Sequence, residues 1–369
     1  MVSSWASYDM GDLRWDNGTT GDLTGDVTSG YIQAKFARRH LTLRLGRTFV
    51  GTGAARIIQV DGGEAVAFLP LGLRLSGYVG APVSQRFQSR SGLQSWNPAG
   101  GDMAYGGRAS WTLVVPGTPG RGLDVGASYA RVDDSGDVAR EEVAGDFRLQ
   151  PFKGNLTVAG LAAYSLPAER LAEANVTGTW SATRKLHLTG DWRFTAPDLL
   201  LSRNSILSVF SAAEWNEFGA GARYDLKPGL QVGADYHLRV EPAEVVDGSS
   251  NTGHEAAANL DWEKPGMAAG LEVFFLDTAE NGYTGGRAYA KKDFGKYFAT
   301  ADVLAHMFRE QVNGEDLALT GTLSAGVHIT PALSAVVAGR AGVTPYLEQT
   351  YDVMAKLAYN QTYTTKEVR

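Results

Sequence analysis

The sequence predicts an all-β fold, a single closed antiparallel transmembrane β-barrel of about 18 strands, roughly 16 to 20. Three observations predict it. Apolar and polar residues alternate along most of the chain, the connections alternate between short and long, and no apolar run approaches the ~18 residues of a membrane helix. We expect the barrel to occupy residues 1–369 as one domain, with 1–30 and 361–369 partly terminal extensions.

The composition narrows the classes of protein. The 369 residues include no cysteine, which excludes disulfide scaffolds, cysteine-based zinc sites and thiol nucleophiles. The formal net charge of -6 gives no reason to expect nucleic acid as a partner. A hydrophobic fraction of 44% is ordinary for a soluble chain, and it also suits a barrel because only every second strand residue meets lipid.

The segment 186–194 shows the alternation clearly. One face carries Leu186, Leu188, Gly190, Trp192 and Phe194, and the other carries Lys185, His187, Thr189, Asp191 and Arg193. Successive side chains of a strand point to opposite faces, so this segment has one apolar and one charged face. The segments 230–241 and 317–329 repeat the pattern.

Further segments of the same kind run from one end of the chain to the other. They lie near 3–15, 31–37, 41–46, 56–69, 73–80, 104–115, 122–131, 140–149, 155–164, 172–182, 215–226, 253–263, 267–276, 285–294, 296–307, 332–341 and 349–360. Between them, short turns alternate with longer polar links at 16–30, 46–55, 81–103, 131–139, 165–171, 196–214, 242–252, 277–284, 308–316 and 342–348. Transmembrane barrels have short periplasmic turns and long extracellular loops, which this alternation matches.

The two faces indicate the surroundings of the sheet. A face this rich in charge cannot be a sandwich core, because unpaired buried charge is very costly. The alternative is that the charged face is the solvent-exposed face of a soluble sheet. Aromatic residues near segment ends, such as Trp180, Tyr224 and Trp262, favour a membrane interface. A sheet in hydrocarbon must close, and ~18 strands give a backbone diameter of roughly 36 Å, which leaves room for water.

Two stretches carry a family resemblance. LTLRLGRTFVGTGAARIIQVDGG (41–63) and LRLSGYVGAPV (73–83) resemble bacterial outer-membrane porin-type β-barrels, in the style of large deltaproteobacterial, myxobacterial barrels. The resemblance implies a location in the outer membrane of a Gram-negative bacterium, with its lipid and lipopolysaccharide as partners. Residues 1–30 lack a signal-peptide pattern. An outer-membrane barrel needs a signal peptide, so we infer that it was removed; the alternative is a cytosolic protein that never had one. Such barrels usually end on an aromatic residue, whereas this chain continues past Tyr359.

Charged residues on the polar face are the candidate site. We expect the pore to be lined by Arg44, Arg74, Arg108, Arg148, Asp191, Arg193, Arg223, Asp235, Arg239, Arg287, Asp302 and Arg340. Such residues pair across strands to stiffen the wall, or form an electrostatic ladder that tunes selectivity, and both roles are compatible.

The sequence predicts no catalytic, cofactor or metal site, and therefore no enzyme. Nucleophile-elbow, phosphate-loop, dinucleotide and zinc-protease motifs are all missing from it. The six histidines are scattered, so a metal site would need distant strands to converge. Asp133–Asp134 and Glu141–Glu142 suggest either a site for Ca²⁺ or lipopolysaccharide-bridging cations, or a solvated loop.

Three functions compete at this stage. The first is a channel for hydrophilic solutes through the charged lumen. The second is the translocon barrel of an export machine, for example for polysaccharide, working with periplasmic export proteins on an exported polymer. The third is a structural barrel that conducts nothing. The link 196–214 is too apolar for a free loop, so we expect it to narrow the channel, with 46–55 as a second constriction.

Overall fold

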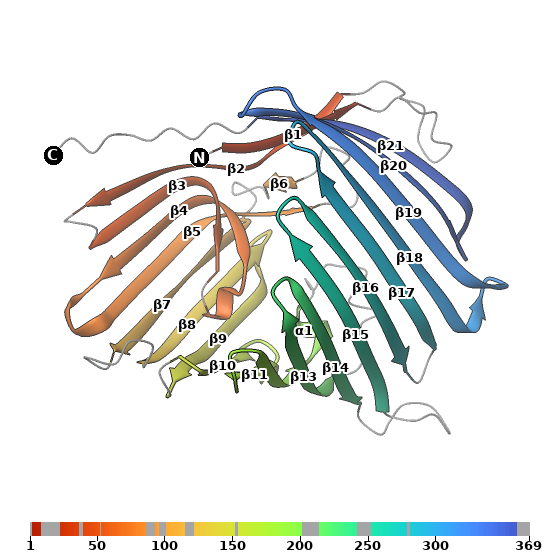
Figure 1. Cartoon of the computed structure of the whole chain (residues 1–369). Helices are drawn as coiled ribbons and strands as arrows, with labels where there is room; N and C mark the ends of the chain where they lie inside the picture. The colour runs from red at the N-terminus through yellow and green to blue at the C-terminus, as the bar shows by residue number, and fades with distance from the viewer. Residues whose placement is uncertain are drawn as a thin grey trace. The chain divides into compact units, whose positions relative to one another are not determined.

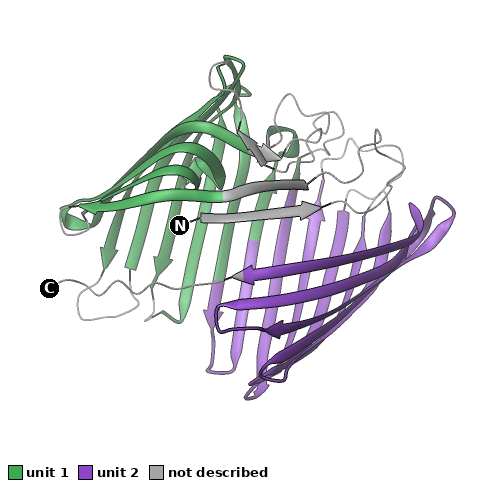
Figure 2. Cartoon of the chain, turned by 90° about the horizontal axis from the view of Figure 1, so that it is seen from above, with its two compact units in different colours: residues 1–178, 192–215 green, residues 179–191, 216–369 purple. Residues whose placement is uncertain are grey.

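The computed structural model describes residues 2–8, 23–36, 40–51, 53–85, 93–95, 101–114, 122–151, 154–200, 214–241, 252–278 and 281–359. In this part of the chain nearly every residue belongs to one of 21 β-strands (Figure 1). The chain divides into two compact units, which are described separately (Figure 2). Unit 1 comprises Met1–Gly178 and Trp192–Trp215, and unit 2 comprises Thr179–Asp191 and Asn216–Arg369.

Unit 1 is built on an antiparallel meander. Each strand pairs with the next along the chain, with one exception at β5. The end of β5 pairs with the short strand β6, and the earlier part of β5 pairs with β7. The strands are β1 (Val2–Tyr8), β2 (Leu23–Phe36), β3 (Leu41–Val50), β4 (Ile58–Phe68), β5 (Leu73–Gln85), β6 (Leu93–Ser95), β7 (Met103–Val114), β8 (Gly122–Asp134), β9 (Asp137–Gln150) and β10 (Leu156–Ser165). Two 3₁₀ turns, Gly53–Ala55 and Pro70–Gly72, and the helix α1 (Pro197–Leu200) also belong to unit 1.

Unit 2 is an uninterrupted antiparallel meander from β13 to β21. Its strands are β13 (Trp215–Lys227), β14 (Leu230–Val240), β15 (Thr252–Lys264), β16 (Met267–Asp277), β17 (Gly282–Asp293), β18 (Tyr297–Val312), β19 (Glu315–His328), β20 (Leu333–Thr344) and β21 (Leu347–Tyr359). Two further strands, β11 (Arg170–Ser181) and β12 (Leu186–Thr195), have residues in both units, as does β13 through its first residue, Trp215. Among the described residues, no helix is both long and apolar enough to cross a membrane.

Strand register in unit 2 aligns the apolar residues into a band. Tyr224 lies opposite Val232, Val232 opposite Leu260, and Leu260 opposite Leu271, so four consecutive strands present these side chains on one face. Each of these side chains is between 38% and 53% exposed. Leu319 and Leu323 are exposed as well, so the expected apolar face is not buried between two sheets.

Each strand segment expected from the sequence has a counterpart, and β6 is additional. The expected link lengths need correction. Three links expected to be long are two-residue turns: 131–139 closes at Ser135–Gly136, 308–316 at Asn313–Gly314, and 342–348 at Pro345–Tyr346. The first two turns have positive φ at both positions, which matches the twist of the flanking strands and lets them pair up to the turn. The strand β2 also begins at Leu23, inside the expected link 16–30.

Candidate functional site

The face opposite the exposed apolar side chains, here called the polar face, carries ladders of ion pairs. In unit 1, Arg108 on β7 donates from Nη2 to Asp124 Oδ1 on β8 at 2.8 Å and from Nε to Asp146 Oδ2 on β9 at 2.9 Å. Arg44 on β3 lies directly opposite Glu64 on β4 and donates to its carboxylate at 3.0 Å. The Arg44–Glu64 and Arg108–Asp124 contacts join neighbouring strands, and the Arg108–Asp146 contact reaches across β8 to β9.

Contacts also involve at least five of the other ten expected pore residues, namely Arg74, Asp191, Arg239, Arg287 and Asp302. In unit 2, Arg287 on β17 donates to Asp302 on β18 at 2.9 Å from Nε. Arg239 pairs with Glu241 at 2.9 Å, and Asp191 lies near His237. In unit 1, the guanidinium of Arg74 lies 5.4 Å from the centre of the Phe68 ring. The remaining members of the set are exposed or half-buried: Arg148, Arg193, Arg223, Asp235 and Arg340.

The link between β3 and β4 folds onto the polar face of unit 1. This inner segment, residues 51 and 53–57 in the described chain, contacts β8, β9 and β10 through its 3₁₀ turn. Ala54 and Ala55 are 0% and 2% exposed. They join a small apolar core on this face whose other members are Val50, Val60, Tyr78, Ala104, Ala130, Ala144 and Ala163. Of the expected link 46–55, residues 46–50 belong to β3, and Gly53–Ala55 form the turn on the polar face. Its role as a second constriction stays a prediction.

Close contact with β8 holds the turn in place. The backbone N–H of Ala54 donates to Ser128 Oγ at 2.8 Å. Gly53 has φ +51, and a Cβ atom there would lie 2.0 Å from the same Ser128 Oγ. Glycine is therefore required at position 53, because it adopts the positive φ and has no Cβ atom to collide with Ser128.

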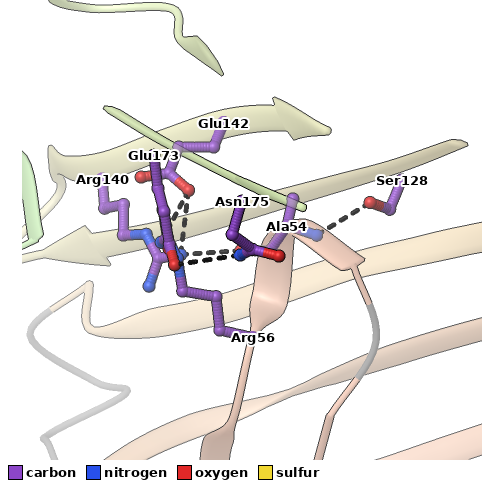
Figure 3. Close-up of polar contacts among 7 residues, drawn as sticks. All are labelled: Ala54, Arg56, Ser128, Arg140, Glu142, Glu173 and Asn175. Carbon is purple, nitrogen blue, oxygen red and sulfur yellow. Dashed lines mark hydrogen bonds and ion pairs between the residues drawn. The ribbon is translucent and has the colours of Figure 1, made fainter. Parts of the chain in front are cut away.

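Two arginines and two glutamates fasten the inner segment, and this group is here called the Arg56 clasp (Figure 3). Arg56 donates from Nη1 to Glu142 Oε2 at 2.9 Å and from Nε to Glu173 Oε2 at 2.5 Å. Arg140 donates from Nη2 to the same Glu142 oxygen at 2.9 Å and to the carbonyl oxygen of Ala54 at 2.6 Å. Glu142 is buried, with its side chain 1% exposed, and lies between both guanidinium groups.

The clasp was only partly foreseeable. The sequence predicts the link 46–55 as a candidate constriction. It does not predict that Arg56, Arg140 or Glu173 belong to a site. The interpretation of Glu141–Glu142 as part of a cation-binding or solvated loop is wrong for Glu142, which lies within β9 and pairs with two arginines. The signal in the sequence was a single charged residue, Arg56, in the segment 51–57, whose other residues are small or apolar.

The other expected constriction lies mostly outside the described residues, since residues 201–213 of the link 196–214 are not described. At its described ends, Arg170 on β11 pairs with Asp198 of α1 and donates to Glu214 at 3.3 Å. The constriction by 196–214 stays a prediction.

No protein-family model matches the chain, and no curated protein matches it. Solved structures similar to it include a mutant of the Rh. blastica porin, with 13% identity over 78% of this chain and 99% of that one at a TM-score of 0.41. The P pilus usher translocation pore is 10% identical over 94% and 83% of the two chains, with a TM-score of 0.45. A bacterial polysaccharide outer membrane secretin is 10% identical over 79% and 98%, with a TM-score of 0.39. Identities this low transfer no activity, substrate or partner to this chain.

Proposed function

We propose that this protein is a channel of the outer membrane of a Gram-negative bacterium, through which hydrophilic solutes pass along the polar face. The proposal rests on two observations. Four strands of unit 2 expose an apolar band on one face. The opposite face carries ion pairs in each unit and, in unit 1, a folded-in segment. Exposed apolar bands of this kind need a partner. Lipid and lipopolysaccharide of the outer membrane supply that partner in the proposed setting.

Closure of the strands into one barrel belongs to the same proposal. Strand edges leave backbone N–H and C=O groups without partners in hydrocarbon, where each such group costs several kcal/mol. A sheet with its apolar face against lipid is therefore stable only when its edges meet. The polar face then encloses the water-filled path.

Within that path, we assign pore lining to the twelve charged residues expected from the sequence. At least six of the twelve form ion pairs: Arg44, Arg108, Asp191, Arg239, Arg287 and Asp302. These pairs support a rigid wall, as at Arg108 with its two carboxylates. The inner segment 51–57, held by the Arg56 clasp, narrows the channel in this proposal. A charged lumen with a fixed constriction selects solutes by size and by charge.

Conductance and ion selectivity across planar bilayers test the proposal. Removing one arginine from the ladder by Arg108→Ala leaves two carboxylates facing the lumen, so we expect open pores whose reversal potential in a KCl gradient shifts toward cation preference. The shift should shrink at high salt, because ions screen charges beyond ~3 Å at 1 M. The matched control is Arg309→Ala, since Arg309 pairs with Asp277 at the ends of β18 and β16, outside the ladder.

Two results would contradict parts of the proposal. Equal shifts for both variants would mean that Arg108 does not line the conducting path. Folded protein that inserts but never conducts would refute the passive channel. It would favour the alternative of an export barrel that opens only with periplasmic partners and an exported polymer.

A further inference from the structure

A second cluster of charged side chains lies in unit 2, away from the Arg56 clasp. Three strands that follow one another in sequence, β12, β13 and β14, contribute Asp191, Glu217 and His237 respectively. One potential ligand atom from each residue lies within 4.8 Å of the other two. His237 Nδ1 is 3.4 Å from Glu217 Oε1 and 3.9 Å from Asp191 Oδ2.

Two of these atoms are buried without a hydrogen-bond partner. They are Asp191 Oδ2 and His237 Nδ1, although both side chains remain partly exposed at 17% and 25%. Buried polar atoms are nearly always satisfied, so an unpartnered oxygen beside an unpartnered nitrogen calls for an explanation. A cation bound to both atoms would satisfy them together.

The neighbouring backbone keeps this space open. Gly219 on β13 lies directly opposite His237 on β14. A Cβ atom at Gly219 would lie 2.4 Å from Asp191 Oδ1 and 2.7 Å from His237 Nδ1. Any other residue at this position would therefore push the two side chains apart. This observation is independent of the unpartnered atoms and points to the same place.

We propose that Asp191, Glu217 and His237 bind a divalent transition-metal ion, with Zn²⁺ as the best fit. Ligand atoms ~2.1 Å from a tetrahedral Zn²⁺ are about 3.4 Å apart, close to the two separations that His237 Nδ1 makes. An imidazole with two carboxylates suits Zn²⁺ and similar ions, whereas Mg²⁺ and Ca²⁺ prefer oxygen ligands alone. Three protein ligands leave a coordination position open to water on the polar face.

The site goes beyond the proposed channel and does not depend on it. A bound Zn²⁺ would place two positive charges on a face where two carboxylates and a histidine otherwise stand. If the polar face lines a pore, as proposed above, the ion would also reduce cation passage. Binding itself is a property of the folded chain and is measurable without any membrane.

Isothermal titration of Zn²⁺ into the full chain, folded in detergent micelles and without a histidine tag, tests the site. We expect one ion per chain in the presence of excess Mg²⁺. His237→Ala should weaken binding by more than the ~10–100-fold that loss of an outer-shell partner costs. Gly219→Ala should weaken it as well, because the new Cβ displaces two ligands without removing either. If the His237→Ala variant does not fold, Asp191→Asn takes its place in the test, because it removes a ligand charge and keeps the shape of the side chain.

His187→Ala is the matched control. Like Asp191, His187 lies on β12 and on the polar face. Its Nε2 is 4.0 Å from Asp225 Oδ2, and it does not belong to the cluster of Asp191, Glu217 and His237. The control should bind Zn²⁺ as the unchanged chain does. Failure of the unchanged chain to bind Zn²⁺ stoichiometrically, or equal losses in the His187 and His237 variants, would overturn the site and leave the channel proposal standing. Binding by a chain that never conducts would support the site and refute the channel.

Discussion

Glu142 is the residue on which the Arg56 clasp depends most. Its carboxylate accepts hydrogen bonds from both Arg56 and Arg140 and is 1% exposed. Glu142→Gln keeps the shape of the side chain but leaves two guanidinium groups facing a neutral amide. Breaking a buried ion pair by changing one partner costs about 3–5 kcal/mol. We take the lower end because Arg56 keeps Glu173 and is itself 22% exposed to water.

A loss of about 3 kcal/mol multiplies the population of the released inner segment by roughly 100-fold, since each 1.4 kcal/mol is a factor of ten. Trypsin reports this directly, because it cleaves after arginine and Arg56 is protected while it is held in the clasp. When opening and closing are faster than cleavage, the rate follows the open population, so the variant should be cut at Arg56 about 100-fold faster. In bilayers, the same release should give larger and noisier single-channel steps.

The matched control for this change is Glu64→Gln. Glu64 is buried on the polar face of the same unit and pairs with Arg44 at 3.0 Å, but it does not take part in the clasp. It should leave the cleavage rate at Arg56 unchanged. Equal cleavage rates in the two variants and the unchanged chain would refute the reasoning, because the clasp would then not be what retains the segment.

Two other predictions concern the faces of the sheet and the inner turn. Val232→Arg on the apolar band should lower the free energy of unfolding in a bilayer by roughly 2–4 kcal/mol, while Gln231→Arg on the opposite face should cost little; equal effects in urea titrations would show that the faces are assigned wrongly. Gly53→Ala should destabilise the protein more than Gly51→Ala, because the added Cβ at Gly53 meets Ser128 Oγ at 2.0 Å whereas the nearest atom at Gly51 is 3.2 Å away. Similar midpoints for the two alanine variants would mean that the turn is not packed against β8.

The sequence alone determined the strands and their two faces. Side chains alternate along any extended chain, so the apolar band and the charged face follow from local geometry without knowledge of which strands are neighbours. The same local patterns predicted some strands to end several residues too early. Ser135–Gly136 and Asn313–Gly314 stand among charged residues that resembled loops, yet the strands continue to both turns because cross-strand pairing satisfies their backbone groups.

Only the tertiary structure decided which charged residues meet. Arg56 pairs with Glu142, 86 residues further along the chain, and His237 meets carboxylates from two other strands. Sliding a strand by two residues keeps every side chain on its own face but changes every cross-strand partner. Alternation therefore specifies the composition of a face, whereas register and the folding of the β3–β4 link specify its contacts. For that reason the clasp and the proposed metal site could not be found from the sequence, although all their residues were in view.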